Sequence, residues 1–133
     1  MPYYFEFDAK NSVLQIRFEG VMTDHALKEY YARASERVPR IAPRAVVTDF
    51  TGVTSFDVSV ATMHSLASSA PTSADPHMLR IAIAPAPHVF GMVRMFQILG
   101  EHTRPSLHVV QSRAEALALL GVRDLQFAPL VDP

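Results

Sequence analysis

The chain contains no cysteine among its 133 residues. This absence excludes disulfides, thiolate catalysis and cysteine-ligated zinc, and it is typical of a reducing compartment. An excess of charge of either sign is also missing, because 12 basic and 13 acidic residues leave a formal net charge of −1. Without a basic excess to neutralise phosphates, the chain is not expected to have nucleic acid as its partner.

Long apolar runs are absent as well. No stretch approaches the roughly 20 apolar residues of a spanning helix, so no membrane span is predicted. Met1 to Asp8 alternate aromatic and acidic residues, with neither a basic n-region nor an apolar h-region, and no signal peptide is expected there. These features predict a cytoplasmic protein of bacterial type.

Motifs of the common enzyme classes are missing too. The five glycines are scattered and form no phosphate-binding loop, and no GxSxG elbow is present. The six histidines show no HExxH spacing, and no paired carboxylates stand out. We therefore expect no catalytic residues, no cofactor and no metal. A site built from His64, His88 and Asp57 is the enzymatic alternative, although singly placed histidines are more often surface or core residues.

What the chain does contain is enough apolar sequence for a packed core. Hydrophobic residues make up 49% of the chain and charged residues 19%, and the length fits one domain. The prediction is a single domain over residues 1–133, with a core at about 3–122 and a tail at 123–133 that packs in an extended form or contacts a partner.

Periodicity predicts the order β-β-α-β-α-β-α-β-α. An antiparallel hairpin opens the chain, Gly20 is expected to end its second strand, and Pro39 is expected to stop the first helix. Ser112 with Glu115 forms a capping box for the last helix. Alternating strands and helices indicate an α/β fold with a mixed, mostly parallel five-stranded sheet and about four helices. The expected strands are 3–8, 13–18, 45–50, 78–84 and 107–110.

Three segments carry a resemblance to a known family: 46–59, 80–83 together with 90–96, and 109–117. With the opening hairpin they cover roughly residues 3 to 122. In this order they resemble the STAS domain (sulfate transporter and anti-sigma factor antagonist), in its SpoIIAA-like branch, whose fold is often described with the CRAL-TRIO fold. The resemblance implies a non-catalytic binding or regulatory module that acts through protein contacts.

The resemblance also points to a phospho-switch at the start of the second helix. Anti-sigma factor antagonists carry an Asp-Ser-Ser-Gly segment there, and a partner kinase phosphorylates its second serine. In this chain Asp57 matches the aspartate and Ser59 the phosphorylated serine, whereas Val58 and Val60 replace the other two residues. A phosphate in the first turn of a helix is favoured by the free N–H groups and the dipole. The alternative is that Asp57 caps the helix and Ser59 is an ordinary first-turn residue.

A second candidate surface lies on the third helix, where apolar residues occupy more than one face. This surplus suggests a ligand or partner surface, and with it a carrier or sensor of a small apolar or lipid-like ligand, or a homodimer. The alternative is burial under the tail by Phe127 and Leu130. Gly91 within this helix indicates close approach to the sheet. The surface comprises His88, Phe90, Met92, Arg94, Met95 and Phe96.

Overall fold

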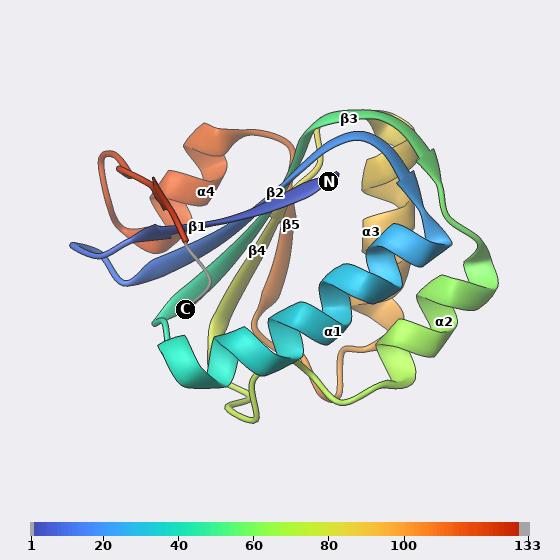
Figure 1. Ribbon diagram of the computed structural model, residues 1–133, viewed down its shortest axis with the longest axis horizontal. Helices are drawn as coiled ribbons and strands as arrows, with labels where there is room; N and C mark the ends of the chain where they lie inside the picture. The colour runs from blue at the N-terminus through green and yellow to red at the C-terminus, as the bar shows by residue number, and fades with distance from the viewer. Residues whose placement is uncertain (1, 131–133) are drawn as a thin grey trace.

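Within residues 2–130, which the computed structural model describes, a six-stranded sheet runs through the molecule and four helices cover it (Figure 1). The strands lie side by side in the order β5-β4-β3-β2-β1-β6. Along the chain the elements are β1 (Tyr3–Asp8), β2 (Val13–Thr23), α1 (Asp24–Ile41), β3 (Ala45–Asp57), α2 (Val60–Ser68), β4 (Leu79–Ile83), α3 (Pro87–Leu99), β5 (Leu107–Val110), α4 (Arg113–Leu120) and β6 (Ala128–Pro129).

The predicted α/β fold and its mostly parallel sheet are confirmed. Strands β2 to β5 pair in parallel, and β1 pairs with β2 as the antiparallel hairpin. The number of strands differs from the expected five, because the tail adds β6 antiparallel to β1. An edge strand offers unpaired backbone groups, and Leu130 N donates to Phe5 O at 2.9 Å. The part of the predicted tail at 131–133 lies outside the described residues.

The two longest strands run past their expected ends, at Gly20 and at residue 50 respectively. β2 continues through Gly20 to Thr23, and β3 continues through Gly52 to Asp57. Register shifts flank Gly20, whose φ of +74° suits an irregular ladder. A Cβ on Gly52 would lie 3.0 Å from the Phe18 carbonyl oxygen, so glycine permits close pairing of β3 with β2 there. Both glycines therefore mark bends within strands rather than strand ends.

Helix α1 also runs past its expected stop. Pro39 lies inside the helix, which ends at Ile41 with Ala42 in the left-handed region at φ 50°. The N–H of Ala42 donates to the Val38 carbonyl at 2.8 Å and closes the last turn. At the other end Thr23 is the N-cap, accepting from the Ala26 N–H. A proline one turn from the end removes one backbone donor without ending the helix.

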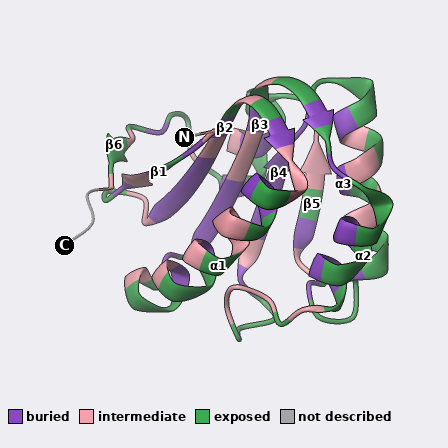
Figure 2. Cartoon of the chain, turned by 45° about the vertical axis from the view of Figure 1, so that its right-hand side comes forward, coloured by how far each residue is buried: buried purple, intermediate pink, exposed green. Residues whose placement is uncertain are grey.

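The sheet separates two apolar cores of different size. Figure 2 shows that many of the buried residues lie in the strands, whereas the helices combine buried and exposed positions. Helices α1, α2 and α3 cover one face, whereas α4 packs on the other (Figure 1). The predicted capping box of α4 is present, and Gly121 ends that helix at φ +71°. The helix residues buried in the larger core are Ala26, Leu27, Ala34, Val38, Met63, Leu66, Val89 and Val93.

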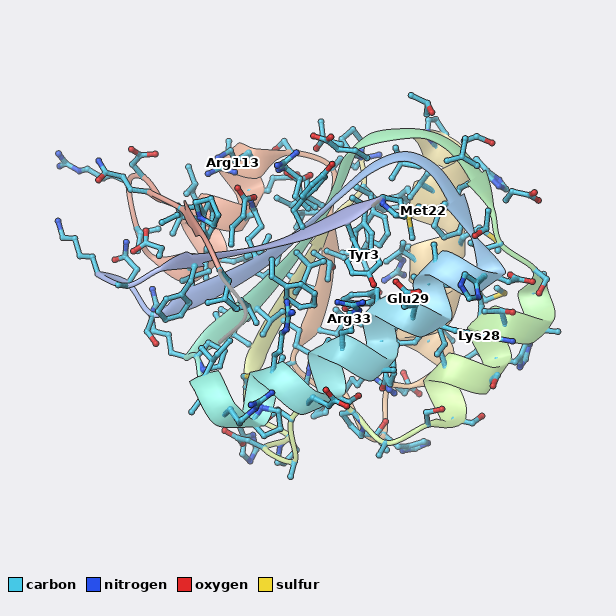
Figure 3. The ribbon with its side chains drawn as sticks, viewed as in Figure 1. Tyr3, Met22, Lys28, Glu29, Arg33 and Arg113 are labelled. Carbon is cyan, nitrogen blue, oxygen red and sulfur yellow. The ribbon has the colours of Figure 1, made fainter. Side chains whose placement is uncertain are left out.

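Helix α1 is also held to the sheet by a polar contact. The buried Tyr3 hydroxyl of β1 donates to the Glu29 carboxylate, and Figure 3 shows these side chains with Arg33 nearby on the same helix. Burial and the Glu29 contact raise the pKa of Tyr3 to about 12, so this phenol stays protonated and keeps donating. The contact fixes the position of α1, whose first residue takes part in the site described next.

Candidate functional site

The first three helices all begin at the same edge of the sheet. Strands β2, β3 and β4 are parallel and lead into α1, α2 and α3 respectively. Because parallel strands end at one edge, the N-terminal ends of these helices share that edge (Figure 1). The carboxyl edge is therefore where side chains from three connections can meet a partner.

Ser59 is the N-cap of α2 rather than a residue of its first turn. Its Oγ accepts from the Thr62 N–H and donates to Thr62 Oγ1, both at 3.1 Å. The alternative in which Asp57 caps this helix is wrong, because α2 begins at Val60 and the Ser59 side chain accepts from its first turn. The Ser59 residue is exposed. Its hydroxyl thus stabilises the helix start at a place that a partner can reach.

Asp24 joins Ser59 across the starts of α1 and α2. The Ser59 N–H donates to Asp24 Oδ1 at 2.7 Å, although the two residues are far apart in sequence. This backbone hydrogen bond is the main cause that lowers the pKa of Asp24. Sequence reasoning missed Asp24 as a site residue, and its only local signal was an acidic residue in the first turn of α1.

Asp57 and His88 line one shallow groove beside this helix start. Asp57 ends β3, where it pairs with Thr23, and it is exposed. The His88 ring meets the Phe56 ring edge-on, with centroids 6.3 Å apart. Val21, which is 54% exposed, adds an apolar wall to the same groove. The structure thus brings Asp57 and His88 to one surface next to Ser59.

The enzymatic alternative gains no support from the histidines. His64 is exposed on α2, and it does not line the groove that contains His88 and Asp57. Among the described residues, no group of three or more His, Asp or Glu side chains is arranged to hold a metal ion.

The predicted surface on α3 is largely part of the core. Phe90, Met92, Met95 and Phe96 are half-buried and pack against the larger core. The exposed members are His88 and Arg94, and Arg94 donates to Gln97 on the same helix. The described part of the tail, up to residue 130, does not cover this helix as the alternative supposed, because β6 lies at the opposite edge of the sheet from β5.

Gly91 does not mark close approach of α3 to the sheet. It is exposed, and a Cβ built on it meets no atom within 4 Å. The expectation is wrong because Gly91 falls between the buried positions Val89 and Val93 and faces away from the sheet. The large apolar side chains that α3 exposes most are instead at its end, Ile98 at 57% and Leu99 at 40%.

No helix within the described part of the chain is long and apolar enough to cross a membrane. No family model matches the sequence, and no curated protein matches it.

Solved structures do resemble the fold. The anti-sigma factor antagonist SpoIIAA in its unphosphorylated form matches with a TM-score of 0.61 and 18% identity, over 92% of this chain and 99% of that one. The Bacillus cell fate determinant SpoIIAA in its phosphorylated form has a TM-score of 0.47 and 21% identity, over 89% of this chain and 98% of that one. The chain therefore has the SpoIIAA-like STAS fold that its sequence resembles.

Proposed function

We propose that this chain is a non-catalytic regulatory module that acts through protein contacts at the start of α2, with Ser59 as its switch residue. The observation that carries the proposal is the exposed Ser59 N-cap, joined to Asp24 and placed at the edge where three helices begin. The fold likeness to an anti-sigma factor antagonist described as unphosphorylated supports a regulatory role of this kind.

Phosphorylation would change this site by electrostatics. A kinase would transfer the terminal phosphoryl group of ATP to Ser59 Oγ, releasing ADP and the hydroxyl proton. The product carries about −1.5 to −2 charges beside the Asp24 carboxylate, which now accepts from the Ser59 N–H at 2.7 Å. Repulsion would displace Asp24, while the first-turn N–H groups of α2 would hold the phosphate. The contact between α1 and α2 would thereby change with the charge state of Ser59.

The neighbouring groove supplies a contact surface for the partner. It combines the exposed acid Asp57, the ring of His88 and the exposed Val21 within one shallow hollow. Apolar groups ringed by polar ones are typical of contact surfaces between proteins. A partner seated there would lie next to Ser59 and would sense its phosphorylation.

The test is quantitative capture of partners in cells of the source organism. Tagged wild-type chain is compared with Ser59→Glu, and Ser65→Glu on an exposed position of the same helix serves as the matched control. We expect one protein to be enriched by wild type and by Ser65→Glu but to be lost with Ser59→Glu. Purified complexes of that protein with each variant then give the affinities by calorimetry.

Two results would contradict this proposal. Equal affinity of the captured protein for wild type and Ser59→Glu would show that the start of α2 is not its contact site. Intact mass spectrometry supplies the second check, because we expect an added phosphoryl group on wild type that is absent from Ser59→Ala. A phosphoryl group that persists in Ser59→Ala would place the modification elsewhere.

A further inference from the structure

A cavity of about 100 Å³ lies between the sheet and helices α1, α2 and α3. It extends from Phe56 and Met63, near Ser59, to Arg80 at the beginning of β4. Most of its wall is apolar, with Phe50 and Phe56 from β3, Met63 from α2 and Val93 from α3. Its polar wall includes Arg80 near the beginning of β4 and Arg104 just before β5. An apolar cavity with cationic groups in its wall is suited to a ligand that has an apolar part and an anionic group.

Arg80 is a buried cation whose Nη1 makes no hydrogen bond. Its side chain points to the three-helix face from β4, and the residue is only 8% exposed. Nη2 donates to the Ser73 carbonyl at 3.1 Å, whereas Nη1 is buried and has no hydrogen-bond partner. Burial, with a further contribution from Arg104, lowers the pKa of Arg80. A buried donor without a partner carries a free-energy cost that a bound acceptor would remove.

Arg104 differs from Arg80, because its hydrogen bonds are made within the protein. It is 3% exposed and donates to the carbonyls of Leu66, Ala67 and Ser69 at the end of α2. It also donates to the Tyr31 hydroxyl at 2.6 Å. Among the described residues, no carboxylate lies within 4.0 Å of either guanidinium. The cavity therefore holds two positive charges without a negative partner.

We propose that this cavity binds a small aliphatic monocarboxylate, whose carboxylate accepts from Arg80 Nη1 and whose hydrocarbon chain lies against Phe50, Met63 and Val93. Nη1 of Arg80 offers two N–H donors, whereas the Nη atoms of Arg104 already donate within the protein. This donor set suits a carboxylate better than a phosphate, which needs more donors. An engineered cavity of about 150 Å³ holds benzene, so the smaller space here suits a chain of roughly three or four carbons. The inference does not depend on the role of Ser59.

The test is titration of the ¹⁵N-labelled full chain with butyrate, followed by NMR and by thermal melts. Butyramide has the same chain without the charge, and inorganic phosphate has charge without the chain. We expect butyrate to give saturable shifts of the amide signals of Arg80, Ile81 and Ala82 and to raise the Tm. Butyramide and phosphate should produce neither effect over the same concentrations.

Variants decide whether Arg80 is the binding residue. Arg80→Met is expected to weaken butyrate binding at least tenfold, while Arg40→Met, which removes an exposed charge at the end of α1, keeps wild-type affinity. The ligand-free Arg80→Met protein should melt no lower than wild type, because the lost guanidinium is incompletely bonded. This separates lost binding from lost folding.

Three outcomes would overturn the proposal. One is the absence of saturable shifts with butyrate in the wild-type protein. Another is an equal response to butyramide or to phosphate. The third is unchanged butyrate affinity in Arg80→Met.

Discussion

Polar groups at the two ends of the layer formed by α1, α2 and α3 differ in how completely they are hydrogen-bonded. At the start of α2, Ser59, Asp24 and Thr62 are joined by hydrogen bonds. Ser59 is exposed, Asp24 is half-buried and Thr62 is buried. At the opposite end of the strands, Arg80 is buried with one nitrogen unbonded, although Arg104 close by makes hydrogen bonds with both of its Nη atoms. An exposed serine within such a hydrogen-bonded cluster is suited to modification or to contact by another protein. A buried and incompletely satisfied cation is suited to a small ligand that replaces the missing acceptor.

The largest expected effect is a difference in stability between variants of Arg104 and Arg80. Arg104→Met removes the buried guanidinium that donates to the carbonyls of Leu66, Ala67 and Ser69, so we expect a loss of about 3 kcal/mol in the free energy of unfolding. Urea unfolding followed by circular dichroism measures this loss. Arg80→Met is the matched variant and should lose no stability. Equal losses in the two variants would contradict the distinction drawn between these arginines.

The next effect concerns the cap of α2. Ser59→Ala removes the acceptor of the Thr62 N–H and should lower the free energy of unfolding by about 1 kcal/mol. Ser65→Ala, at an exposed position within the same helix, should lower it little or not at all. Both values come from the same urea experiment. If the two variants were equally stable, the Ser59 hydroxyl would not be acting as a cap.

Two glycines of the α3 region provide a smaller comparison. Gly91→Ala adds a methyl group in open space and should raise stability by about 0.5 to 1 kcal/mol through helix propensity. Gly100→Ala should instead lower stability, because a Cβ there would lie 2.9 Å from Arg104 Nη1. Thermal melts of both variants give the signs. A stabilised Gly100→Ala protein would show that Arg104 is not held firmly at the end of α2.

The smallest effect is the pH dependence of the Asp24 contact. The pKa of Asp24 is lowered in the folded chain, chiefly by the Ser59 N–H, so its contribution is present above the unfolded value of about 3.9. That contribution is lost as the pH falls through the folded value. The stability difference between wild type and Asp24→Asn should therefore shrink below about pH 4. Urea midpoints measured across this range check the trend, and a constant difference would contradict it.

Much of the fold could be predicted because its signals are local. The order of the strands and helices, the capping box at Ser112 and Glu115, and Gly121 at the end of α4 each depend on neighbouring residues. The wrongly predicted ends of β2 and α1 also have a local cause, because glycine and proline usually interrupt strands and helices, and Gly20 and Pro39 lie at these positions. Pairing of β2 with β3 carried one strand past its glycine, and the last turn of α1 accommodated the proline.

The candidate site was predicted only in part. Ser59 and Asp57 came from the resemblance, but Asp24 did not, since nothing in the sequence near Asp24 indicates a contact with Ser59. The α3 residues were predicted as a surface because periodicity shows which faces are apolar and not what covers them. Here, packing against the larger core half-buries Phe90, Met92, Met95 and Phe96.

The sequence by itself determined the α/β class, the parallel character of the sheet and most helix ends, because hydrophobic period and capping chemistry act within a few residues. Only the tertiary structure decided the sixth strand, the hydrogen bond between Ser59 and Asp24, and the cavity with Arg80 and Arg104. These features join residues that are distant along the chain. Their proximity follows from how the strands pair and how the helices pack on the sheet, which no local pattern encodes.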